Sequence, residues 1–256
     1  MVAVVEPSCG RKWAMLSSDL AQVFDNYFDI RIARTPEDVK AAQMLRYQVY
    51  CVENNFENPE DFPDGLERDA FDERSVHALL VYSPTNLVIG TVRLVLPDPN
   101  GGGLPCQTLQ PSPMEYLNGT FDPSSSAEIS RYSIARTFRQ RVGEKRYPDV
   151  GWRYNPEAIA MRIRRAMPYL SLALFRGIVA LSEEYGVKTV FAVADPVLLR
   201  LLNRFGAELT PLGPLVNHHG RRQPCFARIE DVDSAMYAHR PELWDAVKST
   251  APKLVI

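Results

Sequence analysis

The order of the apolar patterns along the chain is the strongest constraint on its fold. Apolar and polar residues alternate over Phe28–Ala33, which predicts a strand. Thr35 is a typical helix N-cap, and apolar residues at helical spacing follow it as far as Val52. Two apolar runs, His77–Ser83 and Leu87–Leu96, are joined by turn residues and predict a β-hairpin.

The second half of the chain alternates strands and helices. The expected elements are a strand centred on Glu128–Ile134, helices over Pro168–Tyr185 and Val197–Phe205 with the strand Val187–Val193 between them, a final strand pair over Leu209–Val216 and Cys225–Ile229, and a helix over Val232–Val247. This order predicts an α/β (α+β) fold with a mixed central sheet flanked by helices on both faces. We expect residues 1–25 to be a variable lead-in and residues 26–256 to form one domain.

Composition excludes several classes of protein. Apolar residues make up 46% of the chain and charged residues 23%, with a net charge of −2, so no general nucleic-acid binding is expected. The four cysteines show no metal-ligand spacing, and neither a disulfide framework nor a metal site is predicted. We interpret His218-His219 as part of a turn. No secretory leader or membrane span is apparent, which predicts a cytoplasmic location.

Three clusters in the first half place charge beside apolar structure. Arg46 lies near the apolar stripe of its helix, where it could also extend to solvent from the edge. Asp69 and Asp72 flank Phe71 and could hold an ammonium or guanidinium group, or be part of a solvated acidic loop. Arg93 lies in an apolar strand and needs a partner unless that face is open to water.

The strand around Glu128 carries the best candidate for acid–base chemistry. Strand alternation predicts that Glu128, Ser130 and Tyr132 point to one face and Ile129 and Arg131 to the other. Partial burial would raise the pKa of a glutamate on such a strand towards the working pH, which suits a general base. The alternative is a Glu–Arg pair that only stabilises the strand end.

Charge is distributed unevenly along the chain. Residues 53–74 carry nine acids against two arginines, whereas residues 136–165 carry nine bases against three acids. The basic stretch follows the Glu128 strand, so it could dock an acidic or phosphate-bearing partner or be a solvated surface.

Four short segments together carry a family resemblance. In order and spacing, LRYQVY (45–50), ERDAFD (67–72), GTVR (90–93) and EISRY (128–132) resemble the signature of acyl-homoserine-lactone (autoinducer) synthases, members of the GNAT superfamily. The stretches DNYFDIRIA and LNRFGAEL more closely resemble PEP-CTERM/exosortase-associated acyltransferases, relatives of the N-acyl amino acid synthases. The resemblance covers about residues 25–245 and implies a GNAT-like acyl-CoA N-acyltransferase fold.

The resemblance also implies roles for individual residues. Glu128 and Ser130 are the expected catalytic residues, with backbone N–H groups at a break after Ser130 to polarise the thioester carbonyl. Residues expected to bind substrate or hold the charged network are Arg46, Tyr50, Asp69, Asp72, Arg93 and Arg131. Tyr50 replaces the usual phenylalanine, and Phe56 lies near the usual tryptophan, which distinguishes this chain from the enzymes that use S-adenosylmethionine.

The expected acyl donor is a thioester of acyl carrier protein or coenzyme A, with no permanently bound cofactor. An insertion from Phe138 to Met167 replaces the short glycine-rich pyrophosphate loop of ordinary GNAT enzymes and favours the carrier protein. The residues expected to dock the phosphopantetheine or the carrier are Arg139, Arg141, Gly143, Arg162, Arg164 and Arg165. The predicted function is transfer of a long acyl group to the amine of an amino acid or similar molecule. The alternatives are an acyl-homoserine-lactone synthase, a general coenzyme A acetyltransferase and a non-catalytic acyl-carrier or acyl-lipid binding module.

Overall fold

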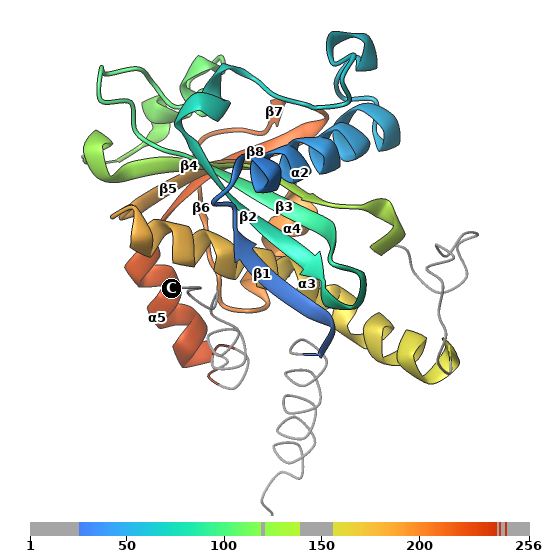
Figure 1. Cartoon of the computed structure of the whole chain (residues 1–256). Helices are drawn as coiled ribbons and strands as arrows, with labels where there is room; N and C mark the ends of the chain where they lie inside the picture. Colours follow the sequence, from blue (N-terminus) through green and yellow to red (C-terminus); the bar gives the residue numbers. More distant parts are fainter. Residues whose placement is uncertain (1–25, 119–120, 139–155, 240, 242–243, 245–256) are drawn as a thin grey trace, which may run out of the picture.

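The computed structural model describes residues 26–118, 121–138, 156–239, 241 and 244, with the backbone alone for residues 137 and 156–168. Within these residues an eight-stranded sheet has the order β1-β2-β3-β4-β5-β8-β6, and β7 pairs with β8 (Figure 1). The strands are β1 (Phe28–Ile32), β2 (Ser75–Tyr82), β3 (Leu87–Val95), β4 (Ser126–Ile134), β5 (Thr189–Ala194), β6 (Thr210–Pro211), β7 (Val216–Asn217) and β8 (Arg221–Arg228). Only β4 and β5 pair in parallel among these strands.

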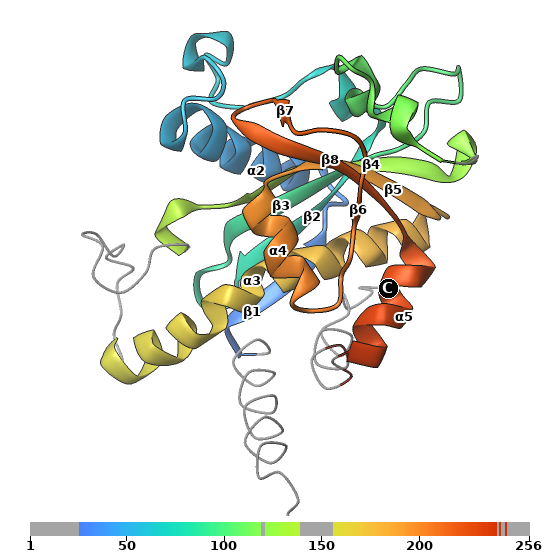
Figure 2. The same ribbon diagram turned by 180° about the vertical axis from the view of Figure 1, so that it is seen from behind.

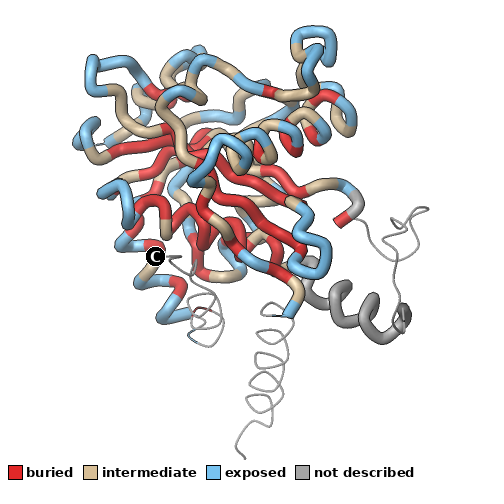
Figure 3. The backbone as a smooth tube through the Cα atoms, viewed as in Figure 1, coloured by how far each residue is buried: buried red, intermediate tan, exposed pale blue. Residues whose placement is uncertain are grey.

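Helices cover both faces of this sheet, as the sequence predicted. The helices are α2 (Pro36–Tyr47), α3 (Pro156–Glu184), α4 (Pro196–Asn203) and α5 (Ile229–His239). Alternate residues of β2 pack on opposite sides: Ala78 and Leu80 join the main core with α3, whereas Leu79 and Val81 pack with Ala42 of α2. Covering both faces explains why the strands are buried along most of their length (Figure 3).

Local sequence signals place most of the first half correctly. The Thr35 hydroxyl accepts a hydrogen bond from the Asp38 N–H (3.1 Å), and the Asp38 carboxylate accepts one from the Thr35 N–H (3.3 Å), which forms a capping box. Beyond Tyr47 the helix widens into a π-helical turn, Gln48–Glu53. The hairpin turn ends at Asn86 in the left-handed conformation, with φ 53°.

The second half differs from the sequence prediction at three elements. One is α5, which begins at Ile229 and not at Val232, and whose predicted end at Val247 lies outside the described residues. Helix α3 begins at Pro156, not near Pro168, so part of the predicted insertion is helical. Pro168 thus lies inside α3, where it provides no N–H for a helical hydrogen bond. The predicted strand over Leu209–Val216 is reduced to β6 and β7, because a turn separates them, while β8 begins earlier, at Arg221 (Figure 2).

Residues 1–25 and most of those after His239 lie outside the described residues, so the lead-in and the single-domain boundary remain predictions. Among the helices that are described, none combines the length and apolar character needed to cross a bilayer.

The contact between α3 and β2 depends on a glycine. A Cβ atom on Gly177 would lie 2.6 Å from the Ala78 Cβ atom. In a helix interior alanine is more favourable than glycine by about 1 kcal/mol, but an added methyl group that overpacks a core costs about 1–3 kcal/mol. We therefore expect Gly177→Ala to lower the free energy of unfolding by about 1–2 kcal/mol in denaturant titrations. Exposed Glu183→Ala in the same helix should change it by less than about 0.5 kcal/mol. An equal effect of both variants would contradict the tight contact.

Candidate functional site

A buried network of charges joins α2, the loop before β2, and strands β3 and β4. It contains three arginines and three carboxylates: Arg46, Arg93, Arg131, Glu67, Asp69 and Asp72. Arg46 is fully buried and donates to both Asp72 carboxylate oxygens, at 2.6 and 2.8 Å, as well as to the Glu67 carboxylate. The alternative in which Arg46 extends to solvent is therefore wrong, and Arg46 belongs to the charged network.

The other two arginines converge on the same loop. Arg93 is 1% exposed and donates to Asp69 at 2.6 and 3.0 Å and to the Ser130 hydroxyl at 2.9 Å. Arg131 donates to Glu67 at 2.9 Å and to Asp69 at 3.0 Å. The face that holds Arg93 is thus closed, and Glu67, Asp69 and Asp72 are partners for guanidinium groups, whereas other acids of this loop, such as Glu60 and Asp64, are exposed.

This pairing keeps Asp69 and Asp72 ionised. Burial alone would raise the pKa of Asp72, yet the hydrogen bonds and charge of Arg46 hold that pKa far below its usual value. The same opposition, with Arg93 as the main partner, lowers the pKa of Asp69.

His77 lies beneath the network and was missed in the sequence. Its side chain is buried on β2 opposite Arg93, with Nε2 3.6 Å from an Asp72 oxygen. Burial, followed by the positive charge of Arg46, lowers the pKa of His77 to about 4, so this imidazole is neutral at physiological pH.

Strand β4 contains a bulge at the site. Thr91 pairs with Ser133 and Arg93 with Ser130, so Arg131 and Tyr132 both lie opposite Val92. Arg131 has the left-handed φ of 51°. The bulge corrects the predicted alternation: Arg131 joins Glu128 and Ser130 on the cavity side, whereas the Tyr132 hydroxyl donates to a carbonyl of α3. The strand break expected within Ser130–Ile134 therefore lies at Arg131 and Tyr132.

Glu128 is buried in a different environment from the carboxylates of the network. It is 3% exposed, and one carboxylate oxygen accepts a hydrogen bond from the Cys106 N–H at 2.6 Å. Burial raises the pKa of Glu128 to about 7, against the opposing effects of that hydrogen bond and of nearby Arg93. The alternative of a Glu–Arg ion pair at the strand end is wrong, because Glu128 accepts its hydrogen bond from a backbone N–H and forms no ion pair with a described arginine.

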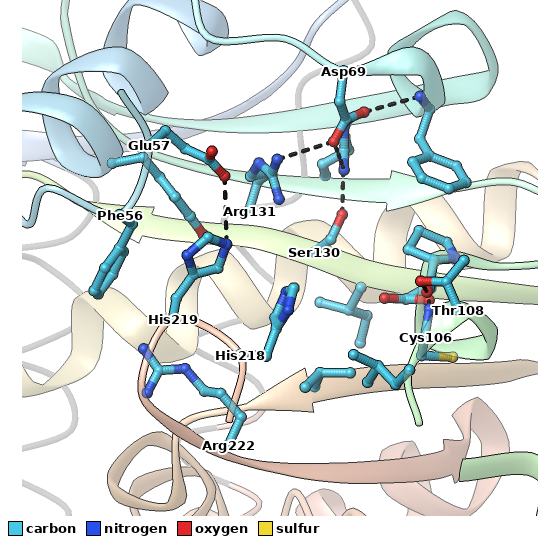
Figure 4. Close-up of a pocket in the computed structure, with 18 residues that line it drawn as sticks. Phe56, Glu57, Asp69, Cys106, Thr108, Ser130, Arg131, His218, His219 and Arg222 are labelled. Atoms are coloured by element: carbon cyan, nitrogen blue, oxygen red, sulfur yellow. Dashed lines mark hydrogen bonds and ion pairs between the residues drawn. The ribbon is translucent and has the colours of Figure 1, made fainter. Parts of the chain in front are cut away.

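These groups surround a cavity of about 240 Å³ (Figure 4). Of the predicted site residues, it is lined by Tyr50, Asp69, Arg93, Glu128, Ser130 and Arg131, whereas Arg46 and Asp72 lie behind the wall. Lining residues that the sequence analysis did not assign to the site include Phe56, Glu57, Cys106, Thr108, His218, His219 and Arg222. The two histidines do lie in a turn, between β7 and β8, but this turn faces the cavity.

The predicted donor-docking residues are not tested by this geometry. Arg139, Arg141 and Gly143 lie outside the described residues, and Arg162, Arg164 and Arg165 are on α3 without described side chains.

Within the described part of the chain, no three His, Cys, Asp or Glu side chains are grouped to hold a metal ion. The cavity wall thus combines a buried carboxyl group, a strand bulge and guanidinium groups held by carboxylates.

The network makes a quantitative prediction for stability. Arg46→Met removes the fully buried guanidinium that pairs with both Glu67 and Asp72 and leaves these carboxylates with Arg131 and Arg93 alone, which we expect to lower the free energy of unfolding by about 3–5 kcal/mol. Arg34→Met is the matched control, because Arg34 pairs with Glu184 at the surface and should contribute less than about 1 kcal/mol. Chemical denaturation of both variants measures the difference, and equal stability would show that the network is not stabilising.

Comparison with known proteins identifies the fold. Residues 45–147 match the acetyltransferase (GNAT) domain family. No curated protein sequence is significantly similar to the chain.

Solved structures match over most of the chain. BjaI, a CoA-dependent acyl-homoserine lactone synthase solved with SAM and isopentyl-CoA, has a TM-score of 0.59 at 19% identity, covering 88% of this chain and 90% of that chain. LasI, an AHL synthase, has a TM-score of 0.56 at 15% identity, covering 83% and 96%. FeeM, an N-acyl amino acid synthase from uncultured soil microbes, has a TM-score of 0.50 at 14% identity, covering 83% and 97%. The chain therefore has the GNAT-like acyltransferase fold that its sequence predicted.

Proposed function

We propose that this chain is an N-acyltransferase that moves an acyl group from a carrier-protein or CoA thioester to the amine of an amino acid or a similar small molecule. The observation that supports it most is the buried Glu128, whose pKa is raised to about 7, on the cavity wall beside the β4 bulge. The fold match to acyl-transferring enzymes, including FeeM, agrees with this function. The link to exosortase systems and the cytoplasmic location stay predictions from the sequence.

In the proposed reaction Glu128 takes a proton from the acceptor's ammonium group, directly or through water. The freed amine attacks the thioester carbonyl carbon, and backbone N–H groups at the bulge stabilise the oxyanion. The C–N bond forms, the nitrogen of the tetrahedral adduct loses its second proton, and the C–S bond breaks. The leaving thiolate takes up that proton, so the products are an amide and a thiol, and the proton held by Glu128 passes to solvent. The buried network contributes by fixing Arg93, Arg131 and Ser130 around the reacting atoms.

A second candidate is an acyl-homoserine-lactone synthase, favoured by the fold match to BjaI, which was solved with SAM and isopentyl-CoA. The test supplies long-chain acyl carrier protein or acyl-CoA as donor, and a pool of amino acids with S-adenosylmethionine as acceptors. Thiol release measures turnover, and the identity of the product separates the candidates. Mass spectrometry should find an N-acyl amino acid. A homoserine lactone product would select the second candidate, and thioester binding without turnover would indicate a binding module.

The assignment of Glu128 is tested by Glu128→Gln. Glutamine keeps the shape and can still accept the Cys106 N–H, but it cannot take a proton, so we expect kcat to fall about 10²-fold or more. Folding should not suffer, because the variant removes a buried group that is costly to ionise; its Tm at pH 8 should equal or exceed that of the wild type. Exposed Glu230→Gln is the control. Turnover of Glu128→Gln near the wild-type level would overturn the assignment.

The pH dependence of the activity should follow the ionisation of Glu128. Glu128 must be ionised to act as a base, and its pKa is raised to about 7. Activity should therefore be low at about pH 5.5, rise as pH increases through about 7, and level off above it. The measurement is kcat/KM against pH for the wild type. A profile that is flat from about pH 5.5 to 8 would be inconsistent with Glu128 as the base.

A further inference from the structure

A cysteine from outside the sheet contacts the proposed base. The chain leaves the sheet after β3 and returns to it at β4, and residues 96–125 form an excursion between the two strands. Cys106 lies in the first 3₁₀ turn of this excursion, Pro105–Thr108, which packs on β5. In Figure 4 Cys106 and Thr108 lie at the end of the cavity away from His219. One end of the site is thus completed by a segment that is not part of the sheet.

The turn that carries Cys106 is fixed by buried contacts. A small apolar cluster contains Leu104, Cys106, Phe191 and Leu212. Phe191 is the β5 residue that pairs with Glu128 in the parallel register. Within the excursion, the Gln107 side chain accepts a hydrogen bond from the Leu104 N–H at 2.6 Å. The turn is therefore held against the strand position next to Glu128.

Two groups of Cys106 donate to one carboxyl group. The Cys106 N–H donates to Glu128 Oε2 at 2.6 Å, and the Cys106 thiol donates a second hydrogen bond to the same carboxyl group. Both residues are buried. Hydrogen bonds to a carboxylate that has been removed from water stabilise its ionised form.

These hydrogen bonds affect Glu128 more than the nearby charges do. Burial raises the pKa of Glu128 to about 7, and the groups that oppose it are, in decreasing order, the N–H and the thiol of Cys106, Arg93 and Arg131. Cys225 of β8 also lies close, but burial, followed by the charge of Glu128, raises the pKa of this cysteine to about 12, so its thiol is neutral. Cys106 is therefore the residue that most favours the ionised form of Glu128.

The Cys106 thiol is a hydrogen-bond donor here and not a nucleophile. Burial, followed by the charge of Glu128, raises the pKa of this thiol far above the physiological range. The thiolate is the form that attacks a thioester, and it is not populated at neutral pH. The contact with Glu128 thus leaves the amine as the attacking group.

We propose that Cys106 is a positioning residue for the base of the proposed reaction, and that its N–H and thiol hold the Glu128 carboxylate and stabilise the ionised form that accepts the proton. The proposal rests on the proposed function and concerns the control of that same site. Since both hydrogen bonds come from one residue of the excursion, any movement of the excursion away from β5 would weaken them together.

The test uses the full-length protein and three variants. Cys106→Ala removes the thiol hydrogen bond and keeps the N–H, whereas Cys106→Ser replaces the thiol with a hydroxyl, which is a stronger donor. Cys225→Ala is the matched control, because this cysteine is also buried but its thiol donates to the Ala192 carbonyl at 3.5 Å. The measurement is kcat/KM against pH with one long-chain acyl thioester and one amino acid.

We expect the inflection of the Cys106→Ala profile to lie about 0.5–1 pH unit above that of the wild type, because the ionised form of Glu128 loses one hydrogen bond. The kcat/KM of this variant should then be about three- to tenfold below the wild type at about pH 6 and close to it at about pH 9. The inflection should lie at or below the wild-type value in Cys106→Ser and stay unchanged in Cys225→Ala.

Three results would overturn the proposal. One is an unchanged inflection in Cys106→Ala, and another is an equal shift in Cys106→Ser or Cys225→Ala, which would trace the effect to lost volume and not to the lost donor. The third is an acyl group attached to Cys106 of the wild type after exposure to the thioester, detected by mass spectrometry, because the thiol would then be a nucleophile.

A double-mutant cycle on stability tests the contact without turnover. Because the pKa of Glu128 is raised, the folded state holds this proton more tightly than the unfolded chain, so the free energy of unfolding falls as pH rises to about 7 and then levels off. In Cys106→Ala the fall should continue to higher pH, and the destabilisation by this variant should therefore grow between about pH 7 and 8. In the Glu128→Gln background the effect of Cys106→Ala should not depend on pH.

The cycle separates failure of this proposal from failure of the proposed function. If no donor supports turnover but the pH-dependent coupling of Cys106 and Glu128 is seen, the contact stands and the acyltransferase proposal fails. If Cys106→Ala has the same effect on stability at every pH in both backgrounds, the positioning role is refuted, whatever the turnover.

Discussion

The buried ion network is the interaction on which the rest of the site depends. Three guanidinium groups and three carboxylates are taken out of water together, and the cost of burying each charge is offset only because every partner is in place. The network fastens α2 and the loop of Glu67 to strands β3 and β4. It therefore fixes one wall of the cavity, including Ser130, which accepts a hydrogen bond from Arg93.

The same sheet face holds carboxyl groups in two opposite electrostatic states. Asp72 lies among arginines and has a pKa far below its usual value, whereas Glu128 lies in a buried place without a guanidinium partner and has a pKa raised to about 7. A difference in pKa of this kind distinguishes a structural carboxylate from a candidate base. The β4 bulge makes it possible, because it brings Arg131 to the cavity side to pair with Glu67 and Asp69, not with Glu128.

Local signals predicted the strands, the Thr35 cap and the charged residues of the network, since each depends on neighbours in the sequence. The parts that failed depend on long-range geometry. Tyr132 was assigned to the wrong face because one extra residue in a bulge reverses strand alternation. His218 and Arg222 were not assigned to the site because only the pairing of β8 with β5 brings their turn to the cavity.

Burial of Glu128 also explains how a carboxylate could deprotonate an amine in the proposed reaction. An α-amino group has a pKa of about 8, so an exposed glutamate near 4.3 would accept its proton at a cost of about 5 kcal/mol. With the pKa of Glu128 at about 7, the same transfer costs about 1.4 kcal/mol. Burial that disfavours the ionised form of Glu128 therefore makes this carboxylate a stronger base for the amine. A carboxylate with an ordinary pKa would need the amine to arrive already neutral.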